Sequence, residues 1–206
     1  KTKSPKLKKG KNGELPVVIC SLGDASVTEG EVSEAFQFAA LHQLPIIYLI
    51  QDNEWGISVS KDEARTNSAY EFIAGFSGIS RITIDGSNFT QSHDTMQMVV
   101  NEVRKNRKPW LVHAKVPLLG HHTSGVRKEF YRSEEDLEKH SRKDPGPQLR
   151  KKLLEASVSE KELKKTEQEA AEKVKEDFAK AAAAPEPDPA SVSEHVFVRT
   201  PVIRES

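Results

Sequence analysis

The chain of 206 residues contains a single cysteine, Cys20, so it cannot form an internal disulfide. Its 31 basic residues are balanced by 31 acidic ones, which leaves no overall positive field to favour nucleic acid or an anionic membrane surface. No apolar run in the sequence reaches the length that spans a bilayer, and no signal or transit pattern is present. These absences argue against a secreted disulfide scaffold, a membrane protein and a nucleic-acid-binding protein, and we expect the protein in the reducing cytoplasm.

Residues 17–53 have the pattern of a strand, a polar turn, a helix, a second strand and a second polar turn. Val17–Leu22 is a continuous apolar run, which is typical of a strand buried on both faces. Thr28 and Glu31 have the spacing of a capping box at a helix start, and Ile46–Ile50 is the second buried strand. The pattern predicts a βαβ unit with parallel strands and a right-handed crossover.

Two polar side chains, Asp24 and Asn53, each follow the end of one of these strands. Because parallel neighbours end at the same edge of a sheet, we expect the two side chains to converge there. One carboxylate oxygen and one amide oxygen facing a helix N-terminus suit a magnesium ion that carries a diphosphate. Gly23-Asp24 alone is more often a simple chain turn, but Asn53 at the matching strand end favours a functional site.

Strand and helix patterns continue to alternate through the next sixty or so residues (roughly one βα repeat per 30 residues). Residues 69–76 predict a short helix and Arg81–Asp85 a strand. Residues from about Ser92 to Asn106 predict a helix with both methionines of the chain on its inner apolar face, and Trp110–Val116 predicts another strand. Such alternation predicts the α/β class, with a doubly wound parallel sheet.

Adjacent histidines, His121 and His122, occur in the segment Gly120–Thr123 after this last predicted strand. They are open to three interpretations, a chance loop pair, a metal site or catalysis. Zinc is disfavoured, because adjacent residues rarely build a compact zinc site and the one cysteine lies far upstream. Their place at the same sheet edge as Asp24 and Asn53 favours catalysis.

The composition predicts four parts. Residues 1–14 are a lysine-rich lead-in that we expect to be solvated and mobile, and residues 15–132 are the α/β domain. Residues 133–184 predict a C-terminal helical arm, and residues 185–206 an extended, proline-rich linker and tail. Because the chain begins with lysine and stops beyond such a linker, we expect it to be a fragment of a longer polypeptide.

Gly23-Asp24-Ala25, followed one helix and one strand later by Asp52-Asn53, resembles the thiamine-diphosphate motif. The sequence from roughly Leu15 to Val198 resembles the α-subunit, or the α-half of a fused chain, of 2-oxo acid dehydrogenases. The resemblance implies a thiamine-diphosphate-binding fold, with thiamine diphosphate and magnesium as cofactors.

By position, the resemblance implies that Asp24 and Asn53 are side-chain ligands of the magnesium ion, and that Trp55 offers its backbone carbonyl. It also implies that His122 is the catalytic histidine beside the cofactor and that Thr123 is the hydroxyl regulated by phosphorylation in some relatives. The remaining cofactor contacts that it implies are Gly23, Ala25, Ser26 and Gln51.

The sequence departs from the motif at two positions. Ala25 replaces the last glycine of its first part, which restricts the approach of the backbone to the cofactor. Asp52 replaces the first asparagine of its second part and adds a negative charge beside the metal site.

The resemblance implies oxidative decarboxylation of a 2-oxo acid, with acyl transfer to the lipoyl group of an acyltransferase core. Gly120-His121-His122 is similar to the branched-chain enzymes, whereas pyruvate enzymes usually place a glycine between their two histidines. A β-subunit or β-half, joined in a heterotetramer, would supply the glutamate that activates the aminopyrimidine ring, so we expect this chain alone to be inactive. Pyruvate dehydrogenase, a transketolase-like transfer and a non-catalytic assembly module that uses the 159–184 helix remain alternatives.

Overall fold

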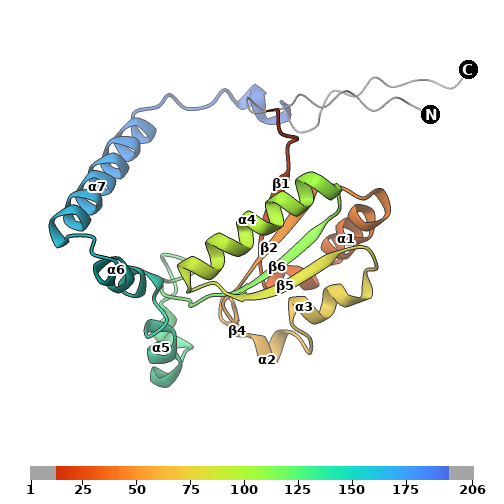
Figure 1. Ribbon diagram of the computed structural model, residues 1–206, viewed down its shortest axis with the longest axis horizontal. Helices are drawn as coiled ribbons and strands as arrows, with labels where there is room; N and C mark the ends of the chain where they lie inside the picture. The colour runs from red at the N-terminus through yellow and green to blue at the C-terminus, as the bar shows by residue number, and fades with distance from the viewer. Residues whose placement is uncertain (1–12, 195–206) are drawn as a thin grey trace, which may run out of the picture. The chain divides into compact units, whose positions relative to one another are not determined.

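The computed structural model describes residues 13–194 and contains a parallel four-stranded sheet (Figure 1). The strands are β1 (Val18–Gly23), β2 (Ile46–Asp52), β5 (Ser80–Asp85) and β6 (Trp110–Lys115), in the spatial order β1-β2-β6-β5. In the register of the sheet, Lys115 lies opposite both Asp52 and Asp85, so the strands end together at one edge. The polar turns that follow the strands therefore gather at that edge.

Helices cover both faces of the sheet, because alternate residues of each strand are apolar on opposite sides. On one face, α1 (Gly30–His42) and α3 (Ala69–Phe72) border a core that contains Phe36, Tyr48 and Leu111. On the other face, α4 (Phe89–Asn106) buries Val99 and Val103 against β2 and β6. Figure 1 shows α4 on one side of the sheet and α1 and α3 on the other, which confirms the predicted α/β class with a parallel sheet.

The prediction that Val17–Leu22 forms a strand buried on both faces is wrong. β1 pairs only with β2 among the described residues, and Val18 and Ile19 are 57% and 51% exposed. An apolar run specifies a strand, but its place at the centre or the edge of a sheet depends on which strands pair with it.

The capping box predicted at Thr28 and Glu31 is also wrong. Residues 25–28 form a 3₁₀ helix in which the hydroxyl of Thr28 donates to the carbonyl of Ala25, and α1 begins only at Gly30. Capping boxes form instead at Ser60–Glu63 and Ser68–Glu71.

The helix predicted from Ser92 to Asn106 is confirmed as α4, three residues longer at its start. Only one of its methionines lies toward the core, since Met98 is 39% exposed whereas Met96 packs beside the buried valines. Residues two positions apart lie on nearly opposite sides of a helix, so both methionines cannot share one face.

Short elements connect the sheet to the polar segments. The hairpin of β3 (Trp55–Gly56) and β4 (Val59–Ser60) follows β2, and α2 (Lys61–Ala64) comes directly after it. Beyond β6, a long loop leads to α5 (Glu134–Ser141) and then α6 (Pro145–Glu155). These connecting segments and the strands β2, β5 and β6 carry most of the polar side chains described below.

The chain divides into two compact units after Leu153. The second contains α7 (Glu160–Ala182), close to the helix that the sequence predicts, with Ser159 accepting a hydrogen bond from the backbone of Glu162. The side chains of α7 are mostly exposed, including Phe178 at 75%. Most of the lysine-rich lead-in and the end of the tail lie outside the described residues, and no described helix is long and apolar enough to cross a membrane.

Candidate functional site

The carboxyl edge of the sheet brings Asp24 and Asn53 together. Asp24 follows β1 and is only 1% exposed, and its Oδ1 lies 3.4 Å from the backbone nitrogen of Asn53, which donates to it. The side chain of Asn53 accepts a hydrogen bond from the backbone of Trp55 at 3.0 Å. The three residues expected around a metal ion are therefore neighbours, joined through two hydrogen bonds.

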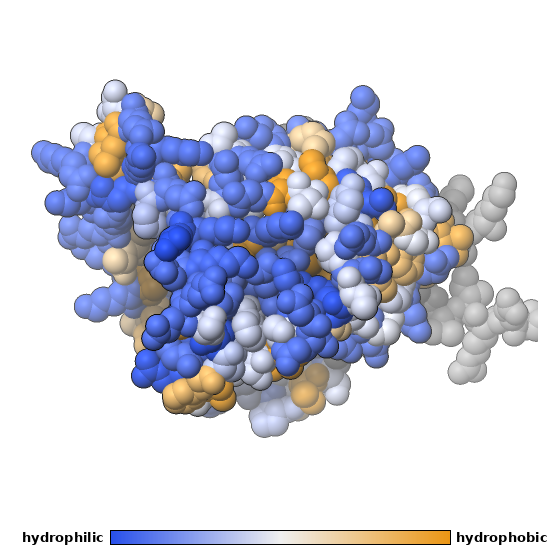
Figure 2. All heavy atoms as spheres, turned by 90° about the horizontal axis from the view of Figure 1, so that it is seen from below, coloured by the Kyte–Doolittle hydropathy of each residue, from blue (hydrophilic) through white to orange (hydrophobic). Residues whose placement is uncertain are grey.

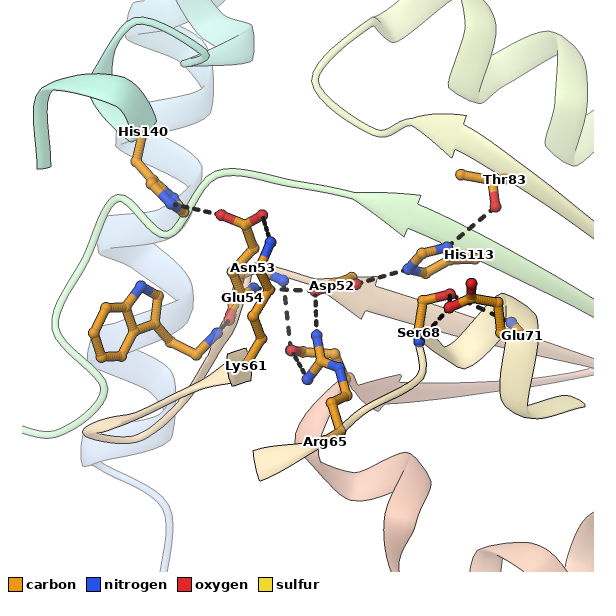
Figure 3. A network of polar contacts seen from close by, with 12 residues as sticks. Asp52, Asn53, Glu54, Lys61, Arg65, Ser68, Glu71, Thr83, His113 and His140 are labelled. Carbon is orange, nitrogen blue, oxygen red and sulfur yellow. Dashed lines mark hydrogen bonds and ion pairs between the residues drawn. The ribbon is translucent and has the colours of Figure 1, made fainter. Parts of the chain in front are cut away.

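A buried arginine, Arg65, lies between the carboxylates of Asp24 and Asp52 at this edge. Figure 3 shows its contact with Asp52. Its Nη1 lies 2.5 Å from Oδ2 of Asp24, and its Nη2 lies 2.9 Å from Oδ1 of Asp52. The Asp52 contact is a hydrogen bond, whereas neither Nη1 nor Asp24 Oδ2 makes a hydrogen bond of ordinary geometry. The Asp24 contact is thus a close charge pair without a well-directed hydrogen bond.

Asp52 is tied on its other side to a buried histidine. Nε2 of His113, in the middle of β6, lies 2.8 Å from Oδ2 of Asp52, and Nδ1 lies 3.1 Å from the hydroxyl of Thr83 on β5 (Figure 3). Burial by itself would raise the pKa of Asp52, but the His113 hydrogen bond and the Arg65 charge outweigh it and hold that pKa below its ordinary value. In a neutral His113 ring, an ionised Asp52 favours the tautomer with the proton on Nε2, and Nδ1 then accepts from the hydroxyl of Thr83.

Asp24 responds in the opposite direction. Its burial, and then the neighbouring charge of Asp52, raise its pKa, although Arg65 acts against both. One guanidinium is therefore shared by two buried carboxylates, and Asp24 is the less well compensated of the two.

A second ion cluster surrounds Glu54, one residue beyond Asn53. Its carboxylate lies 2.7 Å from the ammonium of Lys61 and 2.7 Å from that of Lys139. Burial works against ionisation, but the two lysines lower the pKa of Glu54 to about 2. The cluster joins the loop after β2 to helix α5.

His140 of α5 completes this cluster and is 4% exposed. Its Nδ1 accepts a hydrogen bond from the backbone N–H of Leu118 at 2.8 Å, so in the neutral ring the proton is on Nε2. Nε2 faces Asp136 at 3.4 Å and Glu54 at 3.6 Å, and these three side chains have the composition of a metal site. A protonated Nε2 has no lone pair for a metal, so this arrangement is an ion cluster rather than a ligand set.

A cavity of about 260 Å³ opens beside both clusters. Its lining includes the aspartate, glutamate and histidines just described together with four lysines, namely Lys61, Lys115, Lys139 and Lys143. Figure 2 shows that the surface seen from below Figure 1 is mostly hydrophilic, with only small separated apolar patches. The cavity suits an anionic ligand better than an apolar one.

The other predicted cofactor contacts lie at or near the same edge. Ala25 and Ser26 are partly buried in the 3₁₀ helix after β1, and Ala25 adopts no left-handed backbone conformation. A Cβ on Gly56 would lie 2.8 Å from that of Ala25, so the Ala25 methyl group packs closely against the hairpin. Gln51 is exposed and lies opposite Gly23 in the register.

The predicted catalytic residue His122 lies on an exposed loop. Nδ1 of its neighbour His121 accepts a hydrogen bond from the backbone of Lys128 at 3.2 Å, and the Thr123 hydroxyl accepts one from Val126 at 3.3 Å. Within residues 13–194 no hydrogen bond or ion pair joins His122 to Asp24 or Asn53. The loop begins at the carboxyl edge of the sheet, but no such contact holds His122 against Asp24.

Sequence reasoning missed three buried participants. An arginine in a polar loop is most often part of a surface ion pair, whereas the Arg65 side chain is 7% exposed and contacts two carboxylates. His113 interrupts an otherwise apolar strand, and a lone histidine in such a run was the available signal. His140 gave no comparable signal, because its contacts come from residues distant in sequence.

Most of the chain is similar in sequence to known proteins. Residues 6–190 match the family described as "Dehydrogenase E1 component". The pyruvate dehydrogenase E1 component subunit alpha of Rickettsia bellii is 34% identical over 168 residues, which cover 80% of this chain and 51% of that protein. The 3-methyl-2-oxobutanoate dehydrogenase subunit alpha of Mycobacterium tuberculosis is 32% identical over 147 residues, covering 70% of this chain and 40% of that protein.

Solved structures give a weaker likeness. The transketolase of Campylobacter jejuni has a TM-score of 0.43 and 24% sequence identity over 48% of this chain and 15% of that one. The chain spans about half the length of the curated relatives it matches.

Proposed function

This chain belongs to the dehydrogenase E1 component family, and from that premise we propose that it forms the diphosphate- and magnesium-binding half of a 2-oxo acid dehydrogenase site. The family depends on thiamine diphosphate, and the match covers residues 6–190. The observation that carries the proposal is the meeting of Asp24 and Asn53, from neighbouring parallel strands, at the carboxyl edge of the sheet.

The donor atoms at this edge fit a divalent cation. Asp24 Oδ2 is a hard anionic oxygen that is buried and lies 2.5 Å from Nη1 of Arg65 without a hydrogen bond of ordinary geometry, so it can serve an ion once the guanidinium moves aside. The side-chain amide oxygen Oδ1 of Asn53 accepts one hydrogen bond, from the backbone N–H of Trp55, and retains a second lone pair. We assign Asp24, Asn53 and the backbone carbonyl of Trp55 as the residues that would hold magnesium and, through it, the diphosphate.

Bound thiamine diphosphate supplies the nucleophile and the electron sink for loss of carbon dioxide from a 2-oxo acid. The chain's own residues would bind the cofactor and orient it toward the substrate. Gly23, Ala25, Ser26 and Gln51 would border the cofactor, and His122 would exchange a proton with the reacting carbonyl oxygen. The exposed position of His122 suits a group that must approach a substrate entering from solvent.

For the substrate we propose a branched-chain 2-oxo acid. The adjacent pair His121-His122 supports this choice, while the similar identities to pyruvate and 3-methyl-2-oxobutanoate dehydrogenase subunits favour neither acid. The acyl group would pass to a lipoyl arm on an acyltransferase partner, and a β-subunit would complete the cofactor site. Turnover of 3-methyl-2-oxobutanoate and of pyruvate by the assembled enzyme decides the matter, with a higher kcat/KM expected for the former.

Binding of thiamine diphosphate tests the broader proposal. The enzyme assembled with its β partner should bind the cofactor in a magnesium-dependent manner, and Asp24→Ala should abolish that dependence. Asp85→Ala is the matched control, because Asp85 is an exposed aspartate at the same edge, in the last pair of the β5–β6 register. Absence of magnesium-dependent binding in the unaltered enzyme would favour the non-catalytic assembly module.

A further inference from the structure

We propose that Arg65 and a divalent cation compete for the carboxylate of Asp24, so that Arg65 sets the metal affinity of this site. The inference rests on the proposed function only for the identity of the ion. It assigns to Arg65 a role that the cofactor motif does not contain, that of a resident positive charge at the metal position.

A metal ion and the Arg65 guanidinium cannot both lie on the same side of Asp24 Oδ2. Nη1 of Arg65 lies 2.5 Å from Asp24 Oδ2, and a magnesium ion would lie about 2.1 Å from the same oxygen. An ion on the Arg65 side of that oxygen would overlap the guanidinium, and two cations so close repel each other strongly in a buried site. Occupation by the metal therefore requires Arg65 to withdraw from Asp24.

A metal ion can replace the contact between Arg65 and Asp24. Asp24 Oδ2 and Arg65 Nη1 are both buried, and neither has a hydrogen-bond partner of ordinary geometry. Directional hydrogen bonds are the part of a charge pair that a metal ion cannot reproduce, and this contact lacks them. The Arg65–Asp52 contact at 2.9 Å, in contrast, is a hydrogen bond and has no reason to break.

Arg65 has both a counter-charge and space when it leaves Asp24. Held by Asp52, the guanidinium can swing without losing its counter-charge, so its release does not leave an uncompensated buried cation. Arg65 lies in the walls of two cavities of about 260 and 470 Å³, and the carboxylate of Asp62 borders both. Arg65 therefore has space beside it, and an acidic residue in the walls of that space.

The charges also favour the exchange. Asp24 and Asp52 carry two negative charges, of which Arg65 balances one, and the remaining charge is countered by N–H dipoles, those of His113 and of the backbone at Asn53 and Glu54. Binding of a doubly charged ion at Asp24, with Arg65 kept at Asp52, compensates both carboxylates. Asp52, which replaces the motif's asparagine, then has a definite role as the tether of Arg65.

The test is a titration with Mn²⁺ in the absence of thiamine diphosphate, on the enzyme assembled with its β partner. Electron paramagnetic resonance counts free Mn²⁺, so the measurement needs no turnover. Arg65→Gln should bind Mn²⁺ at least tenfold more tightly than the unaltered enzyme, and Asp24→Asn in the same background should remove the gain. Arg142→Gln is the control, since Arg142 is 73% exposed in an ordinary helix-surface pair with Glu138, and it should leave Mn²⁺ binding unchanged.

Thermal unfolding gives a second readout. Without metal, Arg65→Gln should lower the melting temperature, because two buried carboxylates lose their shared counter-charge. Added Mn²⁺ should raise the melting temperature of this variant more than that of the unaltered enzyme. If Arg65→Gln does not fold, Arg65→Lys replaces it. Lysine keeps the charge but has a shorter side chain and one nitrogen in place of the two that contact Asp24 and Asp52, so it should again permit tighter Mn²⁺ binding.

Unchanged or weaker Mn²⁺ binding in the Arg65 variant, beside normal binding in the unaltered enzyme, would overturn the competition and leave the proposed function intact. Failure of every form to bind Mn²⁺, together with no magnesium-dependent cofactor binding, would overturn both. A tenfold gain in an enzyme that does not bind thiamine diphosphate would support the competition and reject the proposed function.

Discussion

The imidazole of His140 accepts a hydrogen bond from the backbone N–H of Leu118 at 2.8 Å, across 22 residues of sequence. The backbone carbonyl of Leu118 accepts a second hydrogen bond, from Nη1 of Arg132 at 2.9 Å. The two residues that hold Leu118 are almost fully buried, since His140 is 4% and Arg132 is 5% exposed. The first residues of the loop that bears His121 and His122 are thus held by two fixed partners from the segment that follows it.

Removing the acceptor at His140 should loosen this loop. His140→Ala leaves the Leu118 N–H without a partner, and we expect a loss of unfolding free energy of about 1–3 kcal/mol with faster amide exchange in residues 118–127. His140→Asn keeps an oxygen near the position of Nδ1 and should retain most of the protection. Hydrogen exchange and urea unfolding measure both effects, and equal behaviour of the two variants would contradict the role given to this hydrogen bond.

Glu54 should make the stability of the protein depend on acid pH. Burial opposes its ionisation, but Lys139 and Lys61 lower its pKa from an ordinary 4.5 to about 2. A depressed carboxyl pKa adds stability that is complete above the unfolded-state pKa and disappears as the pH falls through the folded-state value. The contribution is therefore present at pH 5 and above, and is lost between about pH 4.5 and pH 2.

Glu54→Gln should accordingly be less stable than the unaltered protein at pH 6 and lose less stability on acidification to about pH 3. That pH lies between the ordinary and the lowered pKa of Glu54. Glu34→Gln, an exposed position on α1, is the control and should follow the unaltered protein. Chemical unfolding at several pH values measures this difference. Parallel pH curves for Glu54→Gln and the unaltered protein would contradict the prediction.

Ala25 and Gly56 should be coupled. A methyl group at Gly56 would lie 2.8 Å from the Ala25 Cβ, so Gly56→Ala alone should cost about 1–3 kcal/mol. Ala25→Gly removes the obstacle, and the double variant should regain most of the loss. Gly75→Ala, where no atom lies within 4 Å of the added Cβ, is the control. A double-mutant cycle by urea unfolding gives the coupling energy, and strict additivity would show that the two positions do not contact.

His122 should affect turnover without affecting folding. Because it is exposed, His122→Ala should change the unfolding free energy by less than about 0.5 kcal/mol. Loss of a proton-transfer group should lower kcat of the assembled enzyme about 10²- to 10⁴-fold. His121→Ala, which removes a hydrogen bond to Lys128, is the comparison and should lower kcat much less. Equal losses in the two variants would indicate that the loop, rather than the His122 ring, carries the effect.

The sequence alone determined the parallel α/β arrangement and the meeting of Asp24 with Asn53. Both follow from local patterns, because apolar runs separated by a helix predict parallel strands, and parallel strands end at one edge. The sequence also predicted the long helices, although their observed first residues differ from the predicted ones by a few positions. Before α1 the difference arises because a 3₁₀ turn precedes the helix.

Tertiary structure decided the rest. Which strand lies at the edge depends on pairing partners, so the exposure of Val18 was not encoded in its apolar run. Arg65 reaches Asp24 and Asp52, and His140 reaches Leu118, only because loops distant in sequence pack at the same sheet edge. The sign and strength of a charge's environment depend on such packing, because burial and the nearest counter-charge, not residue type, determine how an ionisable group behaves.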